Sequence, residues 1–159
     1  MYTLLMILGI VLAGLIAWQD FRDREIHAYL LGLFGLLGGF FSMLERGLEG
    51  IVSLGVNGLL VSLMLASVWL IFRLKDRQAV MDVKLGWGDV VMLYALACWW
   101  EPMAFLTYYS ISVFGLSLVF VSAQMLNKLP KQYPIPLAGA LAISFALSYP
   151  FFHPFSNPF

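Results

Sequence analysis

The stretch Ile51–Phe72 reads IVSLGVNGLLVSLMLASVWLIF and contains no charged side chain. A helix needs about 20 apolar residues to cross the hydrocarbon core of a bilayer, so this stretch is long enough for one crossing. Further long uncharged runs are Met1–Gln19, Ala28–Leu44, Pro102–Asn127 and Gln132–Phe159. A soluble protein can bury one such helix in its core, but five runs in 159 residues indicate an integral membrane protein.

The composition supports the same class, because 62% of the residues are hydrophobic and only 11% are charged. Cys98 is the only cysteine, which excludes an intramolecular disulfide and a cysteine-based zinc site. No Lys or Arg precedes Asp20, so the first run lacks the basic start of a secretory signal, and we expect a retained helix. We therefore predict an all-α, polytopic transmembrane bundle in which residues 1–159 form a single domain.

The apolar runs and the polar connections between them predict about six helices. Their expected ranges are 2–19, 28–44, 51–73, 89–100, 103–126 and 135–152. The fourth is too short for an ordinary span of roughly 17–25 residues. Either it begins at Gly88 or Asp89 within protein, or it dips and turns without a full crossing.

The basic residues predict the orientation of the bundle, because cytoplasmic connections are rich in Lys and Arg. Of the nine basic residues, all except Arg46 fall in the first, third and fifth connections. These are Arg22, Arg24, Arg73, Lys75, Arg77, Lys84, Lys128 and Lys131. Both termini are then extracytoplasmic, in a multi-pass protein of the inner (plasma) membrane.

Small and aromatic residues carry two packing predictions. Glycines at small-residue spacing allow helices to approach closely. We expect this packing role for Gly32, Gly35, Gly38, Gly39, Gly55 and Gly58. We expect Trp99 and Trp100, beside Glu101, to anchor the chain at the membrane interface.

Two acidic residues at the ends of apolar segments are the strongest candidates for chemistry. Asp20 lies in WQDFRDREI (18–26), and Asp89 ends the sequence GWGD (86–89). The predicted topology places both at the cytoplasmic edge, where two carboxyl groups that meet would share a proton. Such a pair can hydrolyse a peptide bond without a metal: one carboxylate takes a proton from water while the protonated partner polarises the scissile carbonyl. Gly86 and Gly88 would leave room for an extended substrate.

A structural role for the same acids remains an alternative, because Asp89 near a helix N-terminus is also a good capping residue. Asp23 and Glu25 are flanked by basic residues and are typical of a solvated loop.

Glu45, Glu49 and Glu101 belong to the opposite side, where we expect surface groups. His27 is expected to be an interfacial polar residue. The chain contains no His-Glu-x-x-His motif, phosphate-binding loop or dinucleotide fingerprint.

At these acids the chain resembles the prepilin peptidase family of GxGD aspartic proteases, which includes type IV prepilin and preflagellin peptidases. Three segments carry the resemblance: DFRDREI (20–26), LGWGD (85–89) and YPIPLAGA (133–140). Length and six-helix organisation agree with the family. The resemblance implies a peptidase-only membrane aspartic endopeptidase with Asp20 and Asp89 as the catalytic acids and with no metal or organic cofactor.

The resemblance also implies the substrate and the partners. The enzyme would remove basic leader peptides from type IV pilin-like precursors at the cytoplasmic membrane face. Asp23 and Glu25 would help attract the leader, beside substrate space provided by Gly86 and Gly88. The expected partners are these precursors and the lipid bilayer, with no nucleic acid.

Two departures from the family pattern leave other functions open. His27 stands where the family usually has Pro, and Val91 stands where a Lys is common. These changes bear on substrate recognition and are compatible with a catalytically silent homologue that scaffolds a pilus or secretion assembly. A small proton-coupled transporter subunit is a second alternative, although it would require acids near the middle of the bilayer.

Overall fold

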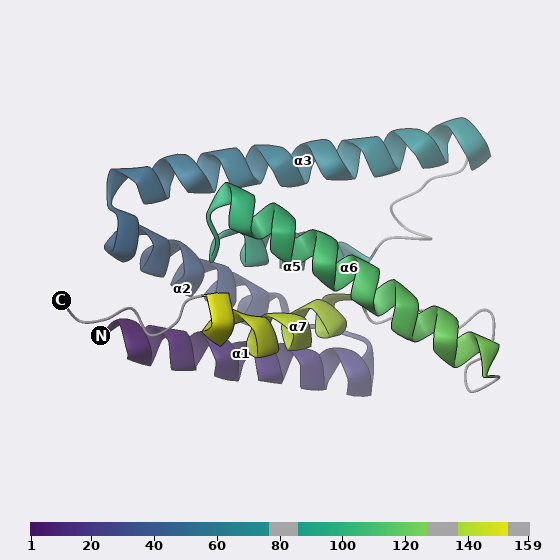
Figure 1. The fold of residues 1–159 in the computed structure, drawn as a ribbon, viewed down its shortest axis with the longest axis horizontal. Coiled ribbons are helices and arrows are strands. Elements are labelled where there is room, and N and C mark those ends of the chain that lie inside the picture. The colour runs from purple at the N-terminus through teal and green to yellow at the C-terminus, as the bar shows by residue number, and fades with distance from the viewer. Residues whose placement is uncertain (77–85, 127–136, 153–159) are drawn as a thin grey trace.

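The computed structural model describes residues 1–76, 86–126 and 137–152, and all its regular structure is helical. Figure 1 shows the arrangement of the helices. They are α1 (Tyr2–Asp23), α2 (Ala28–Arg46), α3 (Leu48–Asp76), α5 (Trp87–Ala97), α6 (Pro102–Met125) and α7 (Leu137–Phe152). The all-helical prediction is confirmed over these ranges. The connections that contain Arg77, Lys84, Lys128, Lys131 and the stretch 133–136 lie outside the described residues.

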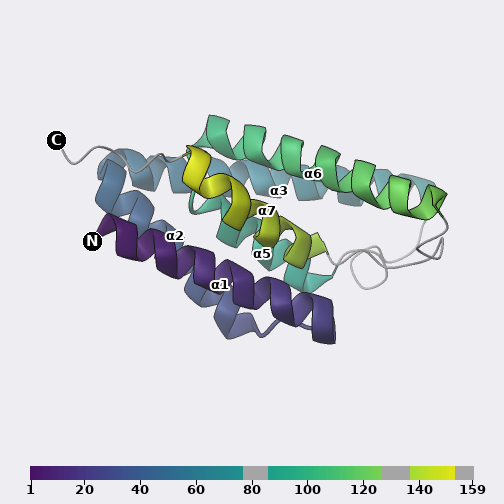
Figure 2. The same ribbon diagram turned by 60° about the horizontal axis from the view of Figure 1, so that its bottom comes forward.

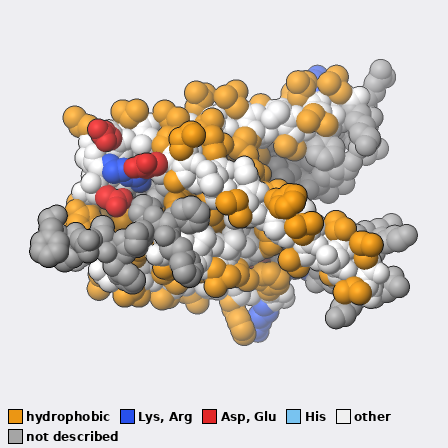
Figure 3. Space-filling model, in the orientation of Figure 1, with side chains coloured by type: hydrophobic (Ala, Val, Ile, Leu, Met, Phe, Trp, Pro, Cys, Tyr) orange, Lys and Arg blue, Asp and Glu red, His pale blue; other side chains and the backbone are white. Residues whose placement is uncertain are grey.

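Four of these helices are long and apolar enough to cross a membrane. The candidate spans are Tyr2–Asp23, Ala28–Arg46, Leu48–Ile71 and Pro102–Ala123. Large apolar side chains such as Leu36, Leu59 and Phe114 are exposed along these helices, as expected of surfaces that face lipid. Figure 3 shows this hydrophobic covering, with acidic side chains gathered around basic ones near one end of the visible face.

The first helix runs further than its apolar run predicts. α1 continues through Asp20 to Asp23 and ends at Arg24, whose backbone is left-handed (φ 56°) and donates its N–H to the Asp20 carbonyl at 3.2 Å. Asp20 was predicted in the connection but lies in the last turn of the helix. The side chain of Gln19 accepts the His27 N–H at 3.3 Å, which joins the end of α1 to the start of α2.

The short helix α5 lies within the bundle, where it contacts α2, α3 and α7. Its 11 residues extend about 16 Å at 1.5 Å per residue, roughly half the hydrocarbon thickness. The carbonyls that follow its last turn need partners inside the protein. The buried Asn57 side chain of α3 supplies them, because its amide donates to Ala97 O at 2.8 Å and to Trp100 O at 2.7 Å. A turn at 98–101 then leads into α6.

The prediction that Trp99 and Trp100 lie at the membrane interface is wrong, because both are buried in the protein. Trp99 packs between Gly9 of α1 and Gly38 of α2, where a Cβ on either glycine would collide with its indole ring. Its ring nitrogen donates to Phe34 O at 3.1 Å. These contacts bring an indole into the core, where aromatic packing outweighs interfacial placement.

The packing prediction for the glycines holds at some positions only. A Cβ at Gly35 would lie 3.3 Å from Ala95 of α5, and Gly38 contacts Trp99 as described. Gly39 is in looser contact, with Leu54 at 3.9 Å. Gly32, Gly55 and Gly58 have no described neighbour within 4 Å, so the prediction is wrong for these three.

The helices alternate in direction, so the bundle has two chemically different ends (Figure 2). The end of α1 and the starts of α5 and α7 lie at one end. Arg46 lies at the other, where its guanidinium is 3.8 Å from Glu45 and 4.0 Å from Glu101. Glu45, Glu49 and Glu101 are exposed, which confirms the prediction that they are surface groups. The Arg46 side chain between Glu45 and Glu101 is only 9% exposed, so the cluster also has a buried part.

Candidate active site

Asp20 projects from the last turn of α1 and is 8% exposed. The negative end of a helix dipole is an unfavourable position for a carboxylate. Its Oδ2 accepts the backbone N–H of Gly139, in the first turn of α7, at 2.6 Å. A short bond from a helix N-terminus stabilises an ionised carboxylate, so α7 compensates for the poor position of Asp20 on its own helix.

Asp89 occupies the first turn of α5, three residues after the N-cap Gly86. Its Oδ1 accepts the backbone N–H of Ala138 at 2.9 Å. Asp89 lies outside the four candidate membrane spans. Burial raises its pKa above the ordinary value, the nearby charge of Asp20 adds to this, and the bond from Ala138 opposes it. The balance favours a carboxyl group that keeps its proton to higher pH than a free aspartic acid.

The two acids meet at α7, because they bind consecutive backbone amides of the same helix end. The chain separates the acids widely, yet α1, α5 and α7 bring them to one place (Figure 2). Asp89 also accepts a backbone hydrogen bond from Gly86, which fixes its side chain at the start of its own helix. The electrostatic influence of Asp20 on Asp89 agrees with their proximity.

A polar cavity of about 410 Å³ opens beside the acids. It is lined by Asp20, Arg24, Glu25, Ile26, Gly86, Trp87, Gly88 and Asp89. Five of the six residues predicted for the site therefore line one cavity. The sixth, Asp23, is not among them, and its carboxylate lies 3.5 Å from Arg22 on the exposed surface of α1.

The backbone conformation at positions 86 and 88 does not require glycine. Neither has a positive φ, and a Cβ would make only ordinary contacts, 3.4 Å from Asp89 Oδ2 and 3.8 Å from Ile26 respectively. Both line the cavity, so a side chain there would take up cavity space while leaving the fold intact. The role of these glycines in leaving room for a substrate stays a prediction.

The predicted site did not include the amides of Ala138 and Gly139 or the side chain of Arg24. The signal for the amides is the sequence IPLAG (135–139), in which Pro precedes a helix whose first N–H groups are free to bind an anion. The sequence identified this segment but did not indicate that both acids would bind to it. Arg24 lines the cavity and has the left-handed backbone conformation that ends α1. An arginine does not by itself predict this conformation.

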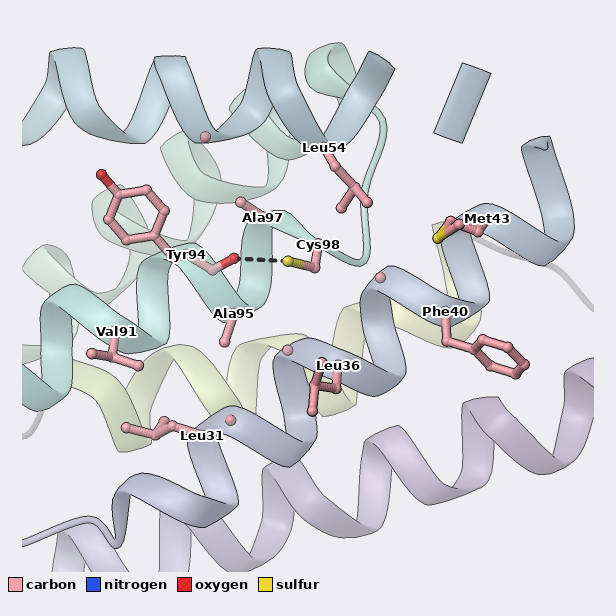
Figure 4. A pocket seen from close by; sticks show the side chains of 14 residues that line it. Leu31, Leu36, Phe40, Met43, Leu54, Val91, Tyr94, Ala95, Ala97 and Cys98 are labelled. Atoms are coloured by element: carbon pink, nitrogen blue, oxygen red, sulfur yellow. Dashed lines mark hydrogen bonds between the residues drawn. The ribbon is translucent and has the colours of Figure 1, made fainter. Parts of the chain in front are cut away.

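A second and larger cavity has a different character (Figure 4). This apolar groove of about 670 Å³ lies between α2, α3 and α5 and is lined by residues such as Leu31, Leu36, Val91, Tyr94 and Cys98. None of the described residues that line it is acidic or basic. Val91 lines this groove and is not among the residues that line the acid cavity.

Within the described ranges, no three His, Cys, Asp or Glu side chains are grouped as metal ligands would be. Comparison of the chain with protein-family models, with curated proteins and with solved structures gives no match.

Proposed function

We propose that this protein is a membrane aspartic endopeptidase in which Asp20 and Asp89 form the catalytic dyad. The observation that carries the proposal is the convergence of the two acids. They come from helices distant in sequence, bind adjacent amides of α7 and line one polar cavity. Two carboxyl groups in such a site share a proton, which is the protonation state that aspartic proteolysis requires.

The chemistry needs only a water molecule and the two side chains. The ionised carboxylate takes a proton from the water, whose oxygen bonds to the scissile carbonyl carbon. The protonated carboxyl group gives its proton to the carbonyl oxygen, which forms a geminal diol. The carbon–nitrogen bond then breaks as the first carboxyl group protonates the leaving nitrogen. A diol hydroxyl returns its proton to the second, which restores the dyad.

The substrate class follows from the family resemblance and from the location of the site. We propose that the protein removes basic leaders from type IV pilin-like precursors. Six membrane-embedded helices would place both termini outside and the dyad at the cytoplasmic face. Arg22 and Arg24 lie at the end of α1, and Arg73 lies near the end of α3. Both helix ends are at the same end of the bundle as the starts of α5 and α7, which supports this orientation. Among the described residues that line the cavity, Asp20, Glu25 and Asp89 are acidic and Arg24 alone is basic, which favours a basic leader.

The position of the acids favours a peptidase over a proton-coupled transporter. Asp20 lies in the last turn of its helix and Asp89 in the first turn of its helix, whereas a proton relay would require acids near mid-bilayer. The residues that depart from the family pattern also leave the dyad contacts intact. His27 is exposed and bonds to Gln19, and Val91 lines the apolar groove.

Co-expression with a pilin-like precursor tests the proposal. We expect wild type to remove the leader, and we expect Asp20→Asn and Asp89→Asn each to reduce cleavage at least about 1,000-fold, as loss of a catalytic acid does. Glu49→Gln is the matched control, because it neutralises an exposed acid in the first turn of α3, at the other end of the bundle. Cleavage that persists in both Asp variants would contradict the proposal.

A further inference from the structure

We propose that the N-terminus of α7 is the positioning element of the dyad and that Gly139 is its key residue. The amides of Ala138 and Gly139 would fix the spacing at which the two carboxyl groups share a proton. The inference rests on the proposed function for its catalytic meaning. The positioning itself is a property of the fold and can be measured separately.

The first support is the pattern of hydrogen bonds. Ala138 N–H binds Asp89 at 2.9 Å and Gly139 N–H binds Asp20 at 2.6 Å. These amides belong to the first helical turn of α7, where no carbonyl of the same helix can accept them. Consecutive amides of a helix have fixed positions relative to each other. Two side chains that bind them are therefore held at a fixed distance from each other.

The second support is steric. A Cβ at Gly139 would lie 2.8 Å from Asp20 Oδ2, 3.0 Å from Asp20 Cβ and 3.2 Å from Phe21 Cδ2. The first distance is too short for the Asp20 carboxylate to remain in place, and the other two are tight. Because α1 and α7 pack closely, a methyl group here must push Asp20 away from the amide that it binds. Glycine at this position is therefore explained by the contact with the dyad.

The expected consequence for catalysis is a change in how the two acids titrate. Displacing one carboxyl group weakens its coupling to the other, so the dyad would no longer titrate as a pair. Substrate contacts elsewhere in the cavity would be unchanged. Among the described residues, the charged groups lining the cavity are Asp20, Arg24, Glu25 and Asp89, so the pH profile of cleavage reports mainly on this set.

Gly139→Ala tests the inference through steady-state cleavage of a precursor peptide. We expect kcat to fall about 100-fold, as for a small misplacement of a catalytic group, with KM changed less than about 3-fold and an altered pH profile. Gly14→Ala is the control, because a Cβ at Gly14 meets no described atom within 4 Å. A kcat and pH profile equal to those of the control would overturn the inference. So would a loss explained entirely by a smaller folded fraction.

A measurement without catalysis separates this inference from the proposed function. In thermal unfolding, Gly139→Ala should lower the melting temperature of the protein that carries Asp20 more than it lowers that of Asp20→Ala, because the shorter side chain removes the atom nearest the added methyl group. Gly14→Ala should change both melting temperatures equally. The first pattern in a protein whose wild type cleaves no precursor would support the positioning role and contradict the peptidase. An equal effect of Gly139→Ala in both backgrounds would overturn the positioning role.

Discussion

At the scale of single residues, the two acids are chemically unequal. Asp20 stands at the unfavourable end of α1 and depends on the amide of Gly139. Asp89 stands at the favourable end of α5, yet its burial and the charge of Asp20 raise its pKa. This inequality favours Asp89 as the group that holds the shared proton. A dyad of this kind has an acid and a base before substrate arrives.

The raised pKa of Asp89 predicts the alkaline side of the pH profile. As the pH rises through this pKa, Asp89 loses its proton and the dyad loses its acid. We therefore expect kcat for peptide cleavage to fall with an apparent pKa above the ordinary 3.8 of an aspartic acid. Initial rates measured across the pH range in detergent check this. Rates that already fall near the ordinary pKa would contradict the assignment.

The raised pKa of Asp89 also predicts how the stability of the protein depends on pH. Because the folded state holds the Asp89 proton more tightly than the unfolded chain, its contribution is present at low pH and is lost as the pH rises through the folded pKa. Asp89→Asn removes this titration. We expect the melting temperature of wild type to fall relative to Asp89→Asn as the pH rises through that range, measured by thermal unfolding in detergent. A constant difference would contradict the raised pKa.

At the scale of elements, the short helix α5 decides how the site is built. α5 has only 11 residues, too few to cross a membrane alone, and its contacts with α2, α3 and α7 hold it in the bundle. Asn57 binds the carbonyls of Ala97 and Trp100, so this helix end is satisfied inside the protein. The apolar run at 90–100 predicted the short helix. Its partner was not predictable, because Asn57 lies in an apolar stretch of α3 and nothing local links the two segments.

Asn57→Ala should therefore destabilise the protein. It leaves two buried carbonyls without their donor, which costs about 1–3 kcal/mol per unsatisfied group. A lower melting temperature in detergent checks this. Ser67→Ala on the same helix is the control, because Ser67 is exposed and bonds only to the carbonyls of Leu63 and Met64 in its own helix. Equal melting temperatures for the two variants would contradict the role of Asn57.

At the scale of the whole molecule, alternating helices give the bundle an acid end and an opposite end (Figure 1). The lengths of the apolar runs predicted the all-helical class. The position of Asp20 and Asp89 at the ends of apolar segments predicted that both would lie at the same end of the bundle. The sequence did not predict the burial of Trp99, because its position beside Glu101 resembles an interface. That burial depends on Gly9 and Gly38, which belong to two other helices. Contacts of this kind come from tertiary packing, which no local pattern records.

The orientation in the membrane is tested by labelling from each side. In a Cys98→Ser background, Glu25→Cys near the dyad should react with a membrane-impermeant thiol reagent only after the cytoplasmic side is exposed. Glu49→Cys, on an exposed position of α3 at the opposite end, should react in intact cells. Labelling of both positions from the same side, or the reverse pattern, would contradict the proposed topology.

Cleavage by the purified protein tests the central proposal most directly. Wild type, Asp20→Asn and Asp89→Asn would be reconstituted separately in lipid vesicles with a pilin-like precursor, and the products identified by mass spectrometry. We predict a single cut between leader and mature segment with wild type and no product above background with either variant. The same cut made by either Asp variant at the wild-type rate would contradict an Asp20–Asp89 dyad.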